Sequence, residues 1–157
     1  MNVALAANGG VASASSVHTL DFPASSANNG DRRGSNLGSG GVWIDATWEL
    51  YPDWLEIDFN ASYAVNRINV FTMQDALTAP AEPTETLTFS QYGITAFQVQ
   101  YWTGTAWATV PGGSVTGNNN VWRSFTFSAI TTNRIRVLVT GAAFGFSSIT
   151  EVEAFTP

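Results

Sequence analysis

The sequence contains no cysteine, no lysine and a single histidine, His18. The absence of cysteine excludes disulfides, thiolate nucleophiles and thiolate metal sites, and it leaves the redox compartment open. Six arginines stand against twelve acidic residues, so the net charge is −6, and Arg32 and Arg33 form the one basic cluster. A surface that follows nucleic acid phosphates needs many more cations, so we expect no nucleic acid partner.

Long apolar runs are also missing. No segment approaches the roughly 20 apolar residues of a membrane-spanning helix, so we expect no membrane span. The first residues lack the basic segment and apolar stretch of a signal peptide, which favours a processed chain or one module of a longer protein. The composition, 45% hydrophobic and 11% charged, is that of a globular protein. We expect a single domain over residues 1–157.

Short runs in which apolar and polar residues alternate occupy much of the chain. In residues 54–59, Leu55, Ile57 and Phe59 alternate with Glu56 and Asp58, the two-residue period of a half-buried strand. Similar runs lie at 65–73, 94–102, 121–127, 134–140 and 149–155. Asn-Gly and Gly-Gly turn signals separate them, and no long stretch has a helical period. The sequence therefore predicts an all-β sandwich or barrel.

Two connections between the expected strands are long, at residues 18–53 and 74–93. Long loops inside a compact domain are usually functional or disordered. Because these contain Trp, Tyr, Asp and Asn, we expect a binding site on them rather than disorder.

Catalysis finds little support in the residues. A nucleophile and base pair needs a base that titrates near neutral pH, and His18 is the single histidine. No nucleophile elbow, phosphate-binding loop or zinc-protease helix motif occurs. Pairs of carboxylates serve in glycoside hydrolysis, but twelve acidic residues are ordinary for a soluble surface. We expect no catalytic residues and no enzyme activity.

The order of several segments carries a resemblance. An opening Asn-Val-Ala-Leu precedes an Asn-Gly-Asp loop and Trp43, and the runs WLEIDF, RINVF, FQVQYWTGTAWATV, RIRVLV and ITEVEAF follow. This order, over essentially the whole chain, resembles the discoidin or coagulation factor type C (F5/8 type C) family, whose bacterial members are often galactose-binding-like carbohydrate-binding modules. The resemblance implies a jelly-roll β-sandwich of about eight antiparallel strands with ligand loops at one end.

The resemblance also implies a structural calcium ion between a glycine-containing loop and a glutamate near the last strand. Ala27, Asn29 and Asp31 match the loop, and Glu151 matches the glutamate. Calcium takes roughly six to eight oxygen ligands, main-chain carbonyls included. Asn29 stands where relatives often have Asp, which should weaken binding. The alternative is an ordinary Asn-Gly turn beside two solvated arginines.

Sugar binding requires an exposed aromatic ring for the CH face of a pyranose and polar side chains for its hydroxyls. Phe144 and Phe146 flank a glycine just before the last expected strand, where similar modules often present such a ring. Their alternative role is to seal the end of the sandwich. The other predicted ligand contacts are Trp48, Tyr92, His18, Asp45, Gln74 and Asp75.

One departure from the family bears on the sugar. In galactose-binding members a His often follows the Trp of the calcium loop, and an Arg ends the strand equivalent to residues 68–75. Here Ile44 follows Trp43, and Met73 or Gln74 stands at the Arg position. The location of the pocket should persist, whereas a preference for galactose need not.

These observations favour a noncatalytic module that binds a glycan or polysaccharide and is stabilised by a structural calcium ion. We expect it to be attached to other domains of a secreted or cell-surface protein. Two alternatives remain. One is an adhesion, protein-interaction or lipid-interaction module of discoidin type that uses the same exposed phenylalanines. The other is a structural spacer in an extracellular protein.

Overall fold

The computed structural model describes all 157 residues and is almost entirely β-structure. Its strands are β1 (Val11–Ala14), β2 (Trp43–Ile44), β3 (Asp53–Thr72), β4 (Ile94–Trp102), β5 (Trp107–Val115), β6 (Trp122–Ala142) and β7 (Ser148–Phe155). Two short 3-10 helices, η1 (Ala6–Asn8) and η2 (Ala24–Asn28), precede β2. No helix has the length and apolar character needed to cross a membrane.

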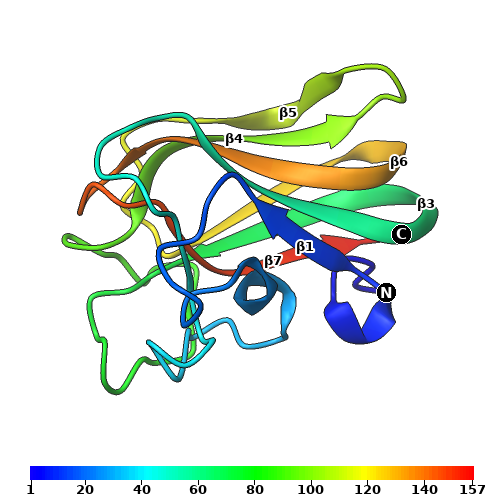
Figure 1. Cartoon of the computed structure of the whole chain (residues 1–157). Coiled ribbons are helices and arrows are strands. Elements are labelled where there is room, and N and C mark those ends of the chain that lie inside the picture. Colours follow the sequence, from blue (N-terminus) through cyan, green and yellow to red (C-terminus); the bar gives the residue numbers. More distant parts are fainter.

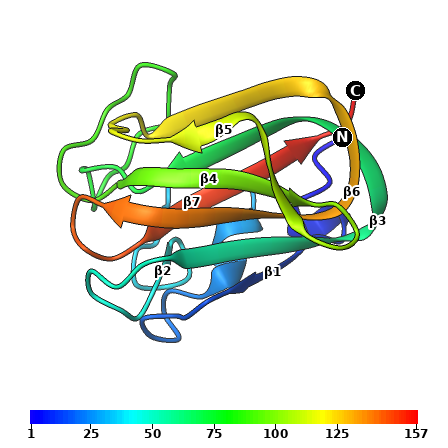
Figure 2. The ribbon, with the colours of Figure 1, turned by 90° about the horizontal axis from the view of Figure 1, so that it is seen from above.

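All strand pairs are antiparallel, in the order β2-β7-β3-β6-β4-β5, with β1 on the free edge of the first part of β3. The strands β3 and β6 are 20 and 21 residues long and bend from one layer into the other (Figure 2). The register between them shifts between Asp58 and Tyr63, at the bend of β3. The predicted all-β sandwich is confirmed.

The strand count is seven instead of about eight. The predicted strands at 54–59 and 65–73 form the single strand β3, and those at 121–127 and 134–140 form β6, except that Met73 and Val121 lie just outside these strands. The residues that join them are still extended, so no turn separates the two halves of either strand, although the pairing of β3 with β6 is broken between Asp58 and Tyr63.

The core lies between the two layers and follows the predicted alternation. Leu55, Ile57 and Phe59 are buried, whereas Glu56 faces outward between them. Opposite them on β6, Val137 and the other inward residues complete one continuous cluster of 22 buried side chains. Burial of apolar surface contributes roughly 25 cal/mol per Å², which makes this cluster the main source of stability.

The long loops gather at the end of the sandwich opposite the two chain termini (Figures 1 and 2). They are residues 15–42, 45–52, 73–93 and 143–147. Main-chain hydrogen bonds join them: His18 N–H donates to the Ile44 carbonyl at 2.8 Å, and Ala143 N–H donates to the Gly93 carbonyl at 2.9 Å. The family resemblance implied this arrangement of the loops.

Candidate functional site

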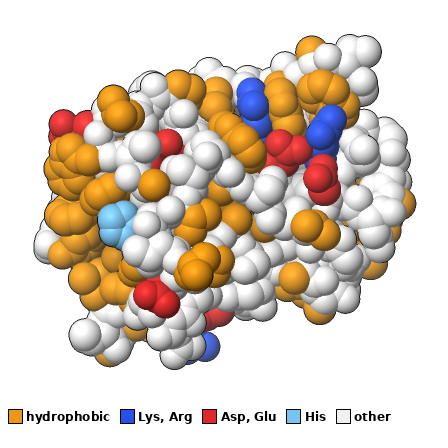
Figure 3. Space-filling view, viewed as in Figure 1, with side chains coloured by type: hydrophobic (Ala, Val, Ile, Leu, Met, Phe, Trp, Pro, Cys, Tyr) orange, Lys and Arg blue, Asp and Glu red, His pale blue; other side chains and the backbone are white.

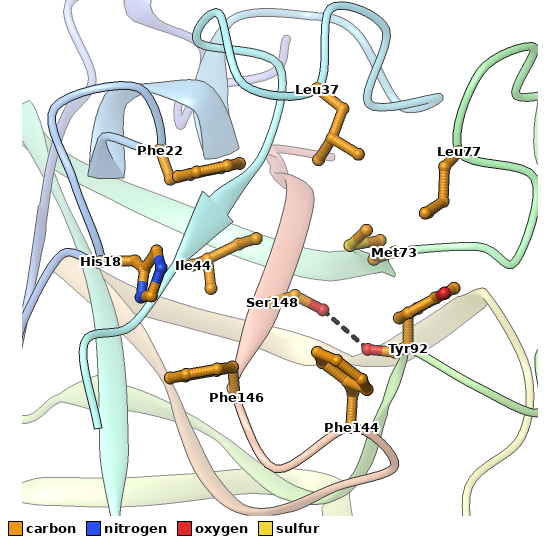
Figure 4. A pocket seen from close by; sticks show the side chains of 10 residues that line it. All are labelled: His18, Phe22, Leu37, Ile44, Met73, Leu77, Tyr92, Phe144, Phe146 and Ser148. Carbon is orange, nitrogen blue, oxygen red and sulfur yellow. Dashed lines mark hydrogen bonds between the residues drawn. The ribbon is translucent and has the colours of Figure 1, made fainter. Parts of the chain in front are cut away.

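The loop end encloses an apolar pocket of about 340 Å³ (Figure 4). Strand ends contribute Ile44 of β2 and Ser148 of β7, and Met73 directly follows β3. The complete lining is His18, Phe22, Leu37, Ile44, Met73, Leu77, Tyr92, Phe144, Phe146 and Ser148. Small-molecule sites commonly have volumes of roughly 300–1,000 Å³, so this pocket suits one sugar residue or a group of similar size.

Aromatic rings form the mouth of the pocket. Trp48 meets Phe144 and Phe146 edge to face, with ring centroids 5.4 and 5.1 Å apart. Tyr92 packs against Phe144 at 5.3 Å, and His18 packs against Phe146 at 5.0 Å. Such contacts hold each ring in one orientation. Phe144 nevertheless remains 49% exposed and Trp48 50% exposed, so both rings offer surface to a ligand.

Gly145 allows both Phe144 and Phe146 to pack against Trp48. Its φ is +86°, in the left-handed region, and a Cβ on it would lie 2.9 Å from the Trp48 indole. Its carbonyl accepts the Glu49 N–H at 2.8 Å, which links this loop to residues 45–52. The aromatic arrangement thus depends on a glycine at this position.

The loop end also carries most of the exposed large hydrophobic side chains. Seven such residues occur in the chain, and five lie on these loops: Val17, Leu20, Trp48, Leu50 and Phe144. Figure 3 shows hydrophobic side chains around the single histidine at this end of the molecule. Exposed apolar patches of this kind mark interaction surfaces.

Asp45, predicted as a ligand contact, has a structural position instead. Its side chain is fully buried, with Oδ1 accepting Ser147 N–H at 2.6 Å and Oδ2 accepting both Thr47 N–H and the Thr47 hydroxyl at 2.7 Å. No surface remains for a sugar, which corrects the prediction. Nearby Asp53 accepts the Ser147 hydroxyl at 2.7 Å, and burial together with the Asp45 charge raises its pKa.

Gln74 and Asp75 also lie outside the pocket lining. Gln74 is buried and bonds both the N–H and the carbonyl of Ala81, which closes the loop 74–81 on itself. Asp75 accepts Ser90 N–H, the Ser90 hydroxyl and Gln91 N–H at 2.8–2.9 Å. Burial opposes ionisation of Asp75, but these hydrogen bonds outweigh it and lower its pKa. These side chains shape the loop 73–93; the burial of Gln74 corrects the prediction of a ligand contact there, whereas a ligand contact of the half-buried Asp75 stays a prediction.

The structure brings together the other predicted ligand residues. His18, Tyr92, Phe144 and Phe146 line the pocket, and Trp48 borders it through its ring contacts. Their binding of a ligand stays a prediction. The lining residues that sequence reasoning missed are Phe22, Leu37, Ile44, Met73, Leu77 and Ser148. Leu37 and Leu77, apolar residues inside long polar loops, were the available signal.

Of the predicted calcium residues, Glu151 lies against the loop that follows η2. Glu151 of β7 is fully buried; its Oε2 accepts Gly30 N–H at 3.1 Å, whereas its Oε1 is buried without a partner. Burial is the main reason that the pKa of Glu151 is raised from 4.5 to about 8; the Gly30 hydrogen bond opposes this rise in pKa, and the nearby Glu153 charge adds to it. A cation would supply the missing partner of Oε1.

The loop itself is held by its own side chains. Asn29 Oδ1 accepts Asp31 N–H at 2.8 Å, and the Asp31 carboxylate accepts Arg33 N–H at 3.1 Å and Ser35 N–H at 2.9 Å. No group of three or more acidic or histidine side chains suited to a metal ion occurs in the chain. A calcium ion at Glu151 would therefore depend mainly on main-chain and amide oxygens, which calcium accepts.

The two-layer antiparallel sandwich, with a pocket among the loops of one end, has the architecture of the galactose-binding-like class of β-sandwiches. The chain belongs to the F5/8 type C family described as NedA-like, galactose-binding domain, which matches residues 26–137. The resemblance seen in the sequence is thus confirmed. No curated protein matches the chain.

Similar solved structures share the fold over nearly their whole length. Chitosan-binding module 1, derived from a chitosanase/glucanase of Paenibacillus sp. IK-5, has a TM-score of 0.72 at 24% identity, covering 99% of this chain and 98% of that one. A Streptococcus pneumoniae fucose binding module has a TM-score of 0.71 at 20% identity, covering 100% and 96%. The family 32 CBM of C. perfringens NanJ, in complex with galactose, has a TM-score of 0.66 at 21% identity, covering 92% of each.

Proposed function

We propose that the protein is a noncatalytic carbohydrate-binding module that binds a glycan in the pocket of the loop end. The observation that carries this proposal is the half-exposed ring of Phe144 at the mouth of a pocket of about 340 Å³. Family membership supports it, as do similar structures whose names describe binding to chitosan, fucose and galactose.

Each exposed group has a role in this proposal. The Phe144 ring stacks on the CH face of the sugar, and its edge-to-face contacts with Trp48 and Tyr92 keep it oriented before binding. A preoriented ring loses little conformational entropy when the ligand arrives. His18 and the Tyr92 hydroxyl are the side chains of the lining that offer hydrogen bonds to the ligand.

A structural calcium ion is the second part of the proposal. Ala27, Asn29, Asp31 and Glu151 would hold it, with main-chain oxygens completing the ligand set. The ion would supply positive charge beside the buried Glu151 carboxylate and join the loop 27–31 to β7. The unpartnered Oε1 of Glu151 supports this assignment.

A second candidate function is docking to an apolar surface of a protein or lipid. The exposure of Leu20 (95%) and Leu50 (67%) on the same set of loops favours it, because neither side chain lines the pocket. The net charge of −6 argues against anionic membranes. In either case we place the module in a larger secreted or cell-surface protein.

A glycan array followed by vesicle binding separates these candidates. We expect discrete glycan hits that disappear in Phe144→Ala and persist in Val11→Ala, a matched change of an exposed apolar residue on β1. An empty array with binding to neutral phospholipid vesicles would replace the proposal by the second candidate. Loss of array signal in both variants would show that the hits are nonspecific.

A further inference from the structure

The pocket is unusually poor in the groups that recognise hydroxyls. Of its ten lining residues, His18, Tyr92 and Ser148 carry a side-chain nitrogen or oxygen. The Ser148 hydroxyl already donates to the Tyr92 carbonyl at 3.0 Å (Figure 4). No carboxylate, carboxamide or guanidinium group lines the pocket.

Two polar side chains next to lining residues, those of Asp45 and Gln74, cannot turn into the pocket without breaking other contacts. Asp45 is buried with both oxygens bonded to Thr47 and Ser147. Gln74 is bonded at both ends of its amide to Ala81 and is buried as well. The interior is instead formed by aliphatic side chains and a thioether, drawn in Figure 4: Ile44, Leu37, Leu77 and Met73.

A pyranose with a full set of hydroxyls fits such an interior badly. A hydroxyl that leaves water without finding a new partner is penalised, whereas a methyl group gains from the same burial. A sugar can still lie with one CH face on Phe144 at the mouth and its remaining hydroxyls in solvent. The part of the ligand that enters the pocket should then be apolar.

We propose that the pocket receives a methyl-bearing substituent of the glycan, such as the methyl group of a 6-deoxy sugar, an N-acetyl group or an O-methyl group. The substituent enters between Ile44, Met73 and Leu77, while His18 and Tyr92 contact polar atoms near the mouth. This inference rests on the proposed function and specifies its ligand class: the module discriminates against sugars whose corresponding position carries a hydroxyl.

Paired titrations test the inference with sugars that differ at one position. L-fucose and L-galactose differ by one hydroxyl at C6, as do L-rhamnose and L-mannose, and each pair is titrated into the intact protein by calorimetry. N-acetylglucosamine and glucose form a third pair. In at least one of the three pairs, we expect the sugar with the methyl group to bind about tenfold or more tightly than its hydroxylated partner, which is the scale of one methyl group in an apolar pocket. Equal binding, or tighter binding of the hydroxylated sugars, overturns the inference and leaves the proposed function standing.

Two pocket variants check that the lining sets this preference. Leu77→Asn and Leu37→Asn each place an amide in the pocket wall, so each should bring the two affinities of a pair closer together. Val11→Asn makes the same kind of change on β1, outside the pocket, and should leave the ratio unchanged. A ratio that stays constant in both pocket variants, with thermal melts showing folded protein, overturns the inference. Absence of binding to every sugar tested and to an array overturns the proposed function, and this inference with it.

Discussion

The buried carboxyl of Glu151 predicts a pH dependence of stability that calcium should remove. In the metal-free protein burial raises the pKa of Glu151 from 4.5 to about 8. The folded state therefore holds a proton that the unfolded state releases between these pH values. Because the unfolded state binds fewer protons in this window, the free energy of unfolding falls as the pH rises.

The size of the effect follows from the shift. Each pH unit between about 4.5 and 8 removes about 1.4 kcal/mol, so the total approaches roughly 4–5 kcal/mol at pH 8. That is a large part of the roughly 5–15 kcal/mol that holds a typical domain folded. Calcium competes with the proton for Glu151, so its affinity should rise over the same pH range.

Thermal melts of chelator-treated protein from pH 5 to 8.5, with and without calcium, measure both effects. Glu151→Gln is the matched control, because its amide oxygen still accepts the Gly30 N–H without a titrating proton. We expect the metal-free wild type to lose stability with rising pH relative to this variant, and calcium to stabilise the wild type alone. Parallel pH curves for the two proteins would refute the reasoning about the buried carboxyl. Equal stabilisation of both by calcium would place the ion elsewhere.

Three further substitutions separate structural roles from ligand contacts, with stability measured by denaturant unfolding. Asp45→Ala should lower the free energy of unfolding by roughly 2–5 kcal/mol, because the buried Ser147 and Thr47 N–H groups lose their acceptor; a loss below 1 kcal/mol would contradict the structural role. Phe144→Ala should cost little stability, whereas Phe97→Ala, with 1% exposure, should cost about 3–5 kcal/mol; similar losses for the two would mean that Phe144 is a core residue. Gly145→Ala should change the near-ultraviolet circular dichroism of the aromatic cluster, because its Cβ meets the Trp48 indole; an unchanged spectrum would count against the arrangement described.

Much of the fold could be predicted from local sequence. The alternation of Leu55, Ile57 and Phe59 with polar residues predicts which face of β3 is buried, and these three side chains are buried in the structure. The continuity of β3 and β6 through their bends was not predictable in this way. It depends on pairing between segments far apart in the chain, such as Tyr63 with Thr132, and not on any local turn signal.

In the candidate site, too, some residues could be predicted from local sequence and others depend on contacts between distant segments. Aromatic residues in loops, among them Phe144 and Trp48, could be predicted from the sequence, because a large ring in a polar loop either contacts a ligand or covers the end of the hydrophobic core. The role of Asp45 could not be predicted because one of its partners is distant in sequence. Asp45 bonds to Ser147, 102 residues away, and Asp75 bonds to Ser90 across the loop 73–93. A carboxylate's availability depends on such partners, which only the folded chain brings near.

The central claim, that a glycan binds on the Phe144 ring at the loop end, is tested most directly by one titration series. The glycan identified on an array is titrated by calorimetry into the wild type and into Phe144→Ala, with the melt of each protein recorded. We predict an affinity loss of at least about tenfold, or about 1.4 kcal/mol, in a variant that melts close to the wild type. Unchanged affinity in a fully folded Phe144→Ala would contradict it.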